Sequence, residues 1–355
     1  MAFLEVKNVS IQGISACVPQ NVVDNALDYP RKWSGYENFV SATGIARHRN
    51  SPEGICSSDL CQNAAEQLIA GLGWDKKDIE ALVFVSQTPD FYNVPATSCL
   101  LQERLGLSSN CYTLDIALGC SGWVYALSVI SSLMQGGSIK KGLLLAGDTP
   151  TKFCSKDDKS TFPLFGDAGT ATALEFSEGA EPIRFSLQTD GSGYKAIIIN
   201  AGGYRNPVSN ESLVMKDYGE GKKRCDLNLE MDGEDVFMFG ISRAPKVIKS
   251  LAEHFGIDLG AIDLFTFHQA NLFMNEKIRS KLKIDAAKVP YSIQEYGNTS
   301  CASIPLTLVT RCAEQMKAGK VQHIACGFGV GLSWGAVNFV TDSIVVPSIM
   351  NYDRV

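Results

Sequence analysis

The stretch Asp115-Ile116-Ala117-Leu118-Gly119-Cys120-Ser121-Gly122-Trp123 joins two apolar segments of the chain. Residues 111–116 before it are predicted to form a strand, and residues 122–134 a buried helix that ends at Gly136-Gly137. Cys120 therefore lies at a strand-to-helix turn, where the flanking glycines permit a tight bend and the close approach of a ligand. The dipole and free N–H groups of a helix N-terminus favour a thiolate, so we predict that Cys120 is a nucleophile. A buried structural cysteine is the alternative.

Strand-like and helix-like segments alternate on both sides of this turn, which is typical of an α/β protein. In the first half, residues 79–85 and 141–146 are predicted strands. In the second half, residues 262–267 and 323–326 occupy the equivalent places. A predicted helix over residues 297–317 corresponds to the helix that follows the cysteine in the first half. The order of segments thus occurs twice.

We interpret this order as two copies of one α/β unit, residues 1–179 and residues 180–355. Similar halves usually pack face to face, and ligand sites favour such interfaces. The expected fold class is α/β, with the two halves stacked in a layered αβαβα arrangement. Chance similarity between two α/β segments is the alternative. Residues 191–234 are rich in Gly, Asn, Lys and Asp, carry no motif, and are predicted to form loops and edge structure.

Composition limits the possible functions. The length of 355 residues fits about two domains, and the net charge of −6 argues against general nucleic-acid binding. The 11 cysteines are odd in number and scattered, which excludes a disulfide framework. The close pair Cys56 and Cys61 lacks partners at zinc-ligand spacing, so we expect no metal site. The sequence has neither the apolar run of about 18 residues that a membrane helix needs nor a signal peptide, so we expect a cytoplasmic protein.

Two polar residues of the second half are candidate partners of Cys120. His268 follows the predicted strand 262–267, and sites form at the C-terminal ends of strands in α/β sheets. Asn298 occupies the repeat position that is equivalent to the cysteine, which directs it to the same place. The turn Gly329-Val330-Gly331 offers free backbone N–H groups that, with that of Cys120, could form an oxyanion hole. The alternatives are a buried histidine with satisfied hydrogen bonds and an asparagine that caps a helix.

Six stretches make the chain similar to the β-ketoacyl-acyl carrier protein synthase III family, within the thiolase-like condensing enzymes. The stretches are Thr43-Gly44-Ile45, Gly119-Cys120-Ser121-Gly122, Phe165-Gly166-Asp167-Ala168-Gly169, His268-Gln269-Ala270-Asn271, Gly297-Asn298-Thr299-Ser300 and Phe328-Gly329-Val330-Gly331-Leu332-Ser333-Trp334-Gly335. The resemblance implies a thiolase-like fold and a homodimer with an interface near residues 85–111. It also implies acyl-CoA or an acyl-acyl carrier protein as substrate, an acyl carrier protein as partner, and no further cofactor.

The resemblance implies a decarboxylative Claisen condensation in fatty acid biosynthesis. An acyl group moves from a carrier thioester to Cys120, and malonyl-acyl carrier protein then loses CO₂ and attacks the acyl-enzyme. His268 and Asn298 complete the catalytic set, because their hydrogen bonds stabilise the enolate. The backbone N–H groups of Cys120 and Val330 form the oxyanion hole, and Phe165 lines the acyl pocket.

The chain departs from the family pattern at several positions. Asn38 and Ala42 stand where a Trp and an Arg contact the adenine of coenzyme A, which favours a carrier-protein donor or a different primer. Val94 stands where the partner subunit commonly closes the acyl pocket with an aromatic residue, which predicts a longer or branched acyl group. Phe273 replaces an Arg that steers the carrier protein. The basic residues that could contact an acidic carrier protein are Lys246, Lys249, Lys277 and Lys281, with a solvated helix face as the alternative.

Three other functions are alternatives to condensation. Transfer of an acyl group to an oxygen or nitrogen of a secondary metabolite, without decarboxylation, is favoured by the changes at positions 38 and 42. A non-catalytic subunit of a condensing heterodimer is disfavoured because Cys120, His268 and Asn298 are all retained. A Cys-His hydrolase would need neither the repeat nor the Gly297–Ser300 element.

Overall fold

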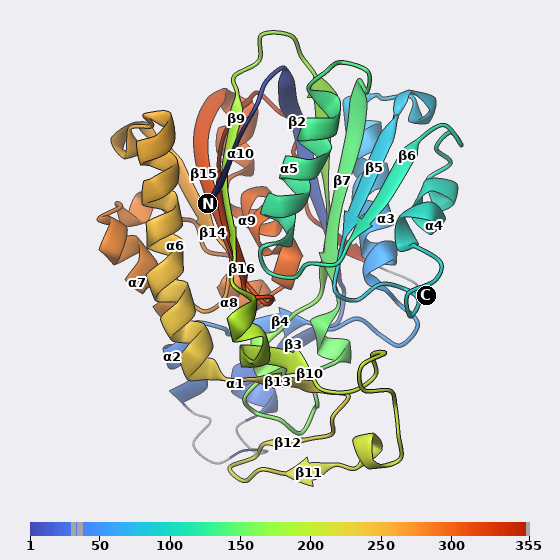
Figure 1. The fold of residues 1–355 in the computed structure, drawn as a ribbon, viewed down its shortest axis with the longest axis vertical. Coiled ribbons are helices and arrows are strands. Elements are labelled where there is room, and N and C mark those ends of the chain that lie inside the picture. The colour runs from blue at the N-terminus through green and yellow to red at the C-terminus, as the bar shows by residue number, and fades with distance from the viewer. Residues whose placement is uncertain (30–32, 34–37, 353–355) are drawn as a thin grey trace.

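The structure is a computed structural model, and it describes residues 1–29, 33 and 38–352. Two mixed β-sheets stack on each other, with helices between the sheets and on their outer faces (Figure 1). The layers therefore follow the order helix, sheet, helix, sheet, helix. This arrangement confirms the layered α/β fold class that the sequence predicts.

The first sheet is built mainly from the N-terminal half. Its strands in the described part of the chain are β2 (Val9–Pro19), β5 (Ala81–Val85), β6 (Tyr112–Ile116), β7 (Lys141–Asp148), β8 (Ala168–Phe176) and β17 (Met350–Tyr352). They lie in the order β17-β2-β8-β7-β5-β6. β5 is parallel to both of its neighbours, whereas β8 is antiparallel to both of its own. β5 and β7 are apolar along almost their whole length because helices cover both faces of the sheet.

The second sheet is built mainly from the C-terminal half. Its strands in the described residues are β1 (Ala2–Val6), β9 (Ile183–Thr189), β14 (Leu264–Phe267), β15 (Lys320–Gly329) and β16 (Ser333–Asp342). They lie in the order β1-β9-β16-β15-β14, and only β14 and β15 are parallel. β14 occupies the edge of this sheet, and it ends at Phe267.

Helices α5 (Gly122–Met134) and α9 (Ser303–Arg311) form the middle layer and contact strands of both sheets. Their buried apolar side chains and those of the facing strands form one continuous core. Helices α3 (Ser57–Leu72) and α4 (Thr97–Arg104) cover the outer face of the first sheet. Helix α6 (Gly233–Phe255) covers the second sheet, and helix α7 (Leu272–Leu282) packs against α6. Short elements complete the main body: α1 (Asn25–Asp28), α2 (Phe39–Thr43), α8 (Ile293–Tyr296), α10 (Ala313–Ala318), β3 (Val22–Asp24) and β4 (Arg47–Arg49).

The sheets exchange strands at the two ends of the chain. β1, from the N-terminus, pairs with β9 in the sheet of the second half. β17, close to the C-terminus, pairs with β2 in the sheet of the first half. Each exchange links the halves by backbone hydrogen bonds. The division into domains of residues 1–179 and 180–355 stays a prediction.

Helix α5 has the bounds that the sequence predicts. The strands predicted at residues 79–85 and 262–267 are present, but each begins two residues later in the structure than predicted. The single helix predicted over residues 297–317 is wrong. Its first turn is a 3-10 helix at Ser300–Ala302, and the α-helical part is interrupted at Cys312, whose dihedral angles of −120° and 2° are not helical.

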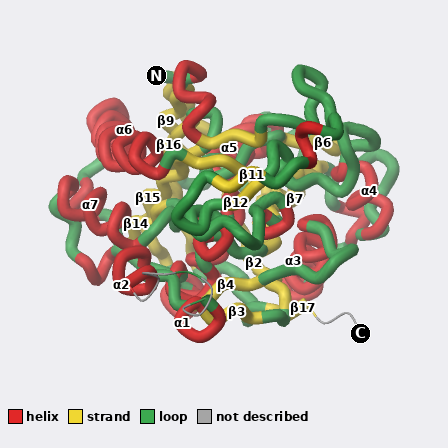
Figure 2. The backbone as a smooth tube through the Cα atoms, turned by 90° about the horizontal axis from the view of Figure 1, so that it is seen from below, coloured by secondary structure: helices red, strands yellow, loops and turns green. Residues whose placement is uncertain are grey.

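Residues 190–232 leave the main body and return to it at one end of the molecule (Figure 1). They contain the short strand pairs β10 (Ile197–Ile199) with β13 (Leu229–Met231) and β11 (Lys216–Asp217) with β12 (Lys223–Arg224). Seen from that end, β11 and β12 lie near the middle of the face, between α6 and α7 on one side and α3 and α4 on the other (Figure 2). We call residues 190–232 the excursion.

The described residues contain no helix that could cross a membrane. In the same part of the chain, no group of three or more His, Cys, Asp or Glu side chains is arranged to hold a metal ion. The 11 cysteines all fall within the described residues, and each is a free thiol.

Candidate active site

Cys120 lies in the turn between β6 and α5, as predicted. A hydrogen bond of 2.6 Å from the Gly122 N–H to the Gly119 carbonyl closes this turn. A Cβ atom on Gly119 would come within 2.5 Å of the Gln87 side chain, and one on Gly122 within 2.7 Å of Val85. Gly122 is therefore required by close packing, and a Cβ atom on Gly119 would also come within 2.8 Å of Val330 Cγ1.

His268 follows the last residue of β14, and its backbone N–H donates to the Cys326 carbonyl at 2.8 Å. Its Nδ1 lies 2.7 Å from the Ser303 hydroxyl oxygen. That oxygen also accepts the Gln269 backbone N–H at 3.5 Å, so its own proton is available for Nδ1. When the hydroxyl donates to Nδ1, the ring proton is on Nε2.

Asn298 lies in the loop before α9. Its backbone N–H donates to the Leu164 carbonyl at 2.8 Å, and its Oδ1 accepts the Ser300 N–H at 2.9 Å. The side-chain oxygen therefore holds a local turn, whereas the N-cap residue of the 3-10 helix that follows is Thr299. Because a backbone N–H needs an acceptor, this contact fixes the orientation of the amide and leaves its NH₂ group for another partner.

One cavity of about 340 Å³ connects these residues. Its wall includes Cys120, His268 and Asn298, and also the predicted Phe165 and Val330. The first residue comes from the N-terminal half and the next two from the C-terminal half, so the cavity lies where the halves meet. The predicted Cys, His and Asn residues are thus brought together.

Burial decides the protonation states of the two titratable groups in the resting site. It raises the pKa of the Cys120 thiol to about 12, and the nearby Asp148 charge adds to the effect. Hydrogen bonds from the Ser300 side chain and from the backbone N–H groups of Cys120 and Val330 act in the opposite direction. Burial lowers the pKa of His268 to about 3. The resting pair is therefore a neutral thiol and a neutral imidazole, because burial outweighs the hydrogen bonds that favour the thiolate.

The predicted glycine-rich turn begins one residue later than expected. Gly329 is the last residue of β15 and pairs with Ser333 of β16, so the turn itself consists of residues 330–332. The Val330 N–H is nevertheless directed to the Cys120 sulfur, as is the cysteine's own N–H. These two donors lie where an oxyanion hole would have to be.

Several residues of the site were missed from the sequence. Asp148, at the end of β7, is fully buried, and its Oδ1 accepts the Gln87 N–H at 2.7 Å and the Ser86 hydroxyl at 2.9 Å. Burial raises the pKa of this carboxyl. Its place after a predicted strand, like that of His268, was a usable signal. Ser300 and Ser303 carried no separate signal.

The positions that depart from the family pattern do not line the cavity. Phe39 and Thr43 of α2 line the cavity, whereas Asn38 and Ala42 are exposed on the same short helix. Val94 is 78% exposed and does not line the cavity of its own chain. The role predicted for Val94 concerns a partner subunit and stays a prediction.

The four predicted carrier-protein lysines are exposed on two helices that pack together, Lys246 and Lys249 on α6 and Lys277 and Lys281 on α7. Lys281 donates to the Ile241 carbonyl of α6 at 3.0 Å. These lysines are accessible to an acyl carrier protein, and their role in binding it stays a prediction.

The sequence matches two family models. Residues 114–191 match the model described as 3-oxoacyl-[acyl-carrier-protein] synthase III, and residues 251–340 match the model of its C-terminal part. The chain is 32% identical over 345 residues to the beta-ketoacyl-[acyl-carrier-protein] synthase III of Streptococcus pneumoniae, covering 95% of this chain and 99% of the relative.

Solved structures agree with the sequence matches. A 3-oxoacyl-(acyl-carrier protein) synthase from Burkholderia xenovorans LB400 is 38% identical and superimposes with a TM-score of 0.91, covering 99% of both chains. The synthase III from Pseudomonas aeruginosa PAO1 is 25% identical, with a TM-score of 0.82 over 96% of this chain and 100% of its own.

Fold and site together define a thiolase-like transferase of the condensing type. The chain belongs to the 3-oxoacyl-[acyl-carrier-protein] synthase III family, whose members are condensing enzymes of fatty acid biosynthesis.

Proposed function

We propose that the protein condenses an acyl thioester with malonyl-acyl carrier protein to give a 3-oxoacyl-acyl carrier protein and CO₂. The observation that carries the proposal is the meeting of Cys120, His268 and Asn298 on one cavity. A thiol next to two hydrogen-bond donors is the set that an acyl-enzyme intermediate and an enolate require.

The first half-reaction transfers the acyl group. The Cys120 sulfur attacks the donor carbonyl, and the backbone N–H groups of Cys120 and Val330 stabilise the oxyanion that forms. The bond to the donor sulfur then breaks, and the thiol proton leaves with the donor thiolate. Because the resting thiol is neutral, its proton has to leave the sulfur as the sulfur attacks the donor carbonyl.

The second half-reaction forms the carbon–carbon bond. Malonyl thioester loses CO₂, and the electron pair of the broken bond moves into the enolate oxygen. The Nε2–H of neutral His268 and the NH₂ group of Asn298 donate to this oxygen. The enolate carbon attacks the acyl-Cys120 carbonyl, the bond to the cysteine sulfur breaks, and the thiolate that leaves takes up a proton from water to restore the resting thiol.

Intact-mass analysis with a panel of acyl thioesters tests this function. The wild-type protein is expected to gain the mass of one acyl group, and Cys120→Ala to gain none. Addition of malonyl-acyl carrier protein should remove the acyl mass and release CO₂. Acylation that persists in Cys120→Ala would contradict the role of the cysteine.

The alternative, acyl transfer to an oxygen or nitrogen acceptor, rests on the changed side chains of Asn38 and Ala42 beside the cavity. It uses the same acyl-enzyme but no malonyl thioester. Loss of the acyl mass to a hydroxyl or amine acceptor, with no CO₂ released from malonyl-acyl carrier protein, would favour it.

The substrate-free thiol should show the pH dependence of a buried group. Alkylation of Cys120 by iodoacetamide is expected to accelerate about tenfold per pH unit from about pH 7 to pH 10. A pKa of about 12 leaves the thiol protonated over this whole range, so the thiolate fraction rises throughout. Peptide mass mapping separates Cys120 from the other cysteines. A rate that levels off below about pH 9 would contradict the neutral resting thiol.

The acyl group and the partners are part of the proposal. We expect a homodimer in which Val94 of one subunit closes the acyl pocket of the other. In that case Val94→Phe should reduce acylation by a decanoyl thioester relative to an acetyl thioester by about tenfold, since the larger ring fills space. Equal acylation by both donors, with neither rate changed in Val94→Phe, would refute this role. Charge reversal of Lys246 and Lys249 tests the docking of the carrier protein.

A further inference from the structure

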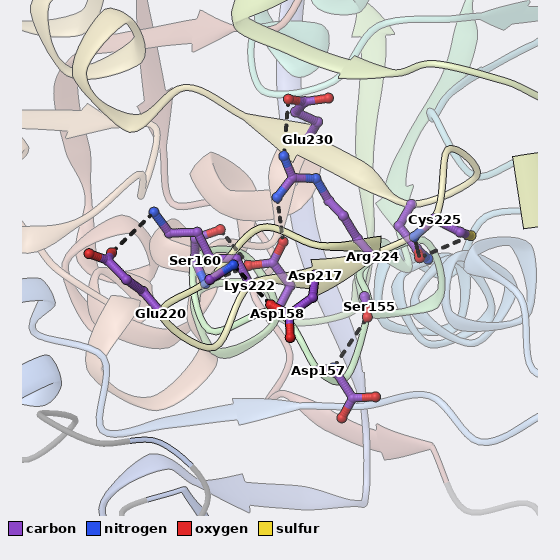
Figure 3. A network of polar contacts seen from close by, with 12 residues as sticks. Ser155, Asp157, Asp158, Ser160, Asp217, Glu220, Lys222, Arg224, Cys225 and Glu230 are labelled. Carbon is purple, nitrogen blue, oxygen red and sulfur yellow. Dashed lines mark hydrogen bonds and ion pairs between the residues drawn. The ribbon is translucent and has the colours of Figure 1, made fainter. Parts of the chain in front are cut away.

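Arg224, the last residue of β12 in the excursion, is a cation that is almost removed from solvent. Its side chain is 11% exposed, and its guanidinium lies 4.2 Å from the centre of the Tyr218 ring. Nη1 lies 3.1 Å from a carboxylate oxygen of Asp158, and Nη2 lies 3.0 Å from one of Glu230 (Figure 3). One planar group therefore connects two segments that are far apart in the sequence.

The first of these segments forms one wall of the cavity. Asp158 is fully buried, and its other oxygen accepts the Ser160 N–H at 2.9 Å and the Ser160 hydroxyl. Ser160 and its neighbour Lys159 line the cavity. The Lys159 N–H also donates to the Gly221 carbonyl at 3.0 Å, so backbone contacts of the excursion support the side-chain contact.

The second segment forms the adjoining wall. Glu230 is the middle residue of β13, and the residues on either side of it, Leu229 and Met231, line the cavity. Alternation along a strand directs Glu230 to the other face, where the Asn200 amide also donates to it at 2.8 Å. The strand that pairs with β13 contributes Ile197 to the cavity as well.

We infer that Arg224 is a positioning residue that holds the Lys159–Ser160 wall and the β13 wall at a fixed separation, and thereby determines which thioester donors reach Cys120. The inference rests on the proposed acylation of Cys120. Guanidinium is suited to this role because its two terminal nitrogens lie in one rigid plane and each can bind a different carboxylate. Arg224 touches neither the cysteine nor His268 and Asn298, so the chemistry at saturation should not depend on it.

The test measures the rate of Cys120 acylation by intact mass against donor concentration, with butanoyl and decanoyl thioesters of N-acetylcysteamine. Arg224→Met is expected to raise the KM for the decanoyl donor at least tenfold while the saturating rate stays within about twofold of wild type. Arg243→Met is the matched control, because Arg243 also pairs with a carboxylate, Asp190, and stacks on a ring, that of Trp334, but lies outside the cavity wall. Its KM should not change.

A double variant separates positioning from stability. Arg224→Met leaves the buried Asp158 carboxylate without its cation, which destabilises the fold. Asp158→Asn in the same chain removes that charge, so thermal stability should return toward wild type while the raised KM remains. If KM returns together with stability, or if Arg224→Met keeps a wild-type KM, the inference is wrong. If wild-type protein gains no acyl mass, the proposed function fails instead.

Discussion

Replacement of Asn298 by aspartate is expected to slow condensation by about 100- to 1,000-fold while acylation of Cys120 stays close to the wild-type rate. Loss of one preorganised donor to a developing oxyanion costs about this much in other enzymes. Aspartate keeps the side-chain oxygen that accepts the Ser300 N–H at 2.9 Å, so the local turn survives. It lacks the NH₂ group that would donate to the enolate, and its charge opposes enolate formation.

The two half-reactions serve as each other's control. Acylation is followed by intact mass in the absence of malonyl thioester, and decarboxylation by CO₂ release after the acyl donor has been consumed. Asn298→Ala removes the turn acceptor together with the donor, so it should lower thermal stability more than the aspartate variant does. If both half-reactions slow equally in Asn298→Asp, then Asn298 is not an enolate donor and acts by shaping the cavity.

The local parts of the site could be predicted because short-range chemistry determines them. The glycines around Cys120 and the apolar small-residue run after it specify a turn and a helix, and α5 has the predicted bounds. His268 was found from its place after a predicted strand, and Asn298 from its place in the repeat. The same local reasoning overlooked burial: a helix terminus favours a thiolate, but in this cavity desolvation raises the pKa of the thiol to about 12.

The parts that could not be predicted depend on contacts between distant segments. Strand exchange by β1 and β17 is decided by pairing across the whole chain, and no pattern within either strand specifies its partner. The excursion looked like loops, yet Ile197, Leu229 and Met231 in it line the cavity. Their side chains are ordinary apolar residues, and contacts between distant segments hold them at the cavity, such as the Leu229 N–H donating to the Phe153 carbonyl at 2.9 Å and Arg224 pairing with Asp158 and Glu230.

Gly329 is the residue at which a single methyl group should do most damage to the site. β15 passes directly behind the cysteine, so a Cβ atom on Gly329 would lie 2.6 Å from the Cys120 Cβ and 2.9 Å from its Sγ. Both distances are too short for carbon and sulfur atoms that are not bonded. The strand is paired with Ser333 and cannot retreat without loss of its ladder, so the cysteine has to move.

Gly329→Ala is therefore expected to slow acylation of Cys120 by about 100-fold or more, since a shift of about 1 Å in a reacting group costs that much. Gly319→Ala is the matched control at the other end of β15, because nothing lies within 4 Å of its Cβ position and its φ of 165° is open to any residue. That variant should acylate at the wild-type rate. Thermal unfolding of both variants shows whether β15 keeps its place. An acylation rate within twofold of wild type in Gly329→Ala would mean that the strand yields and the cysteine does not.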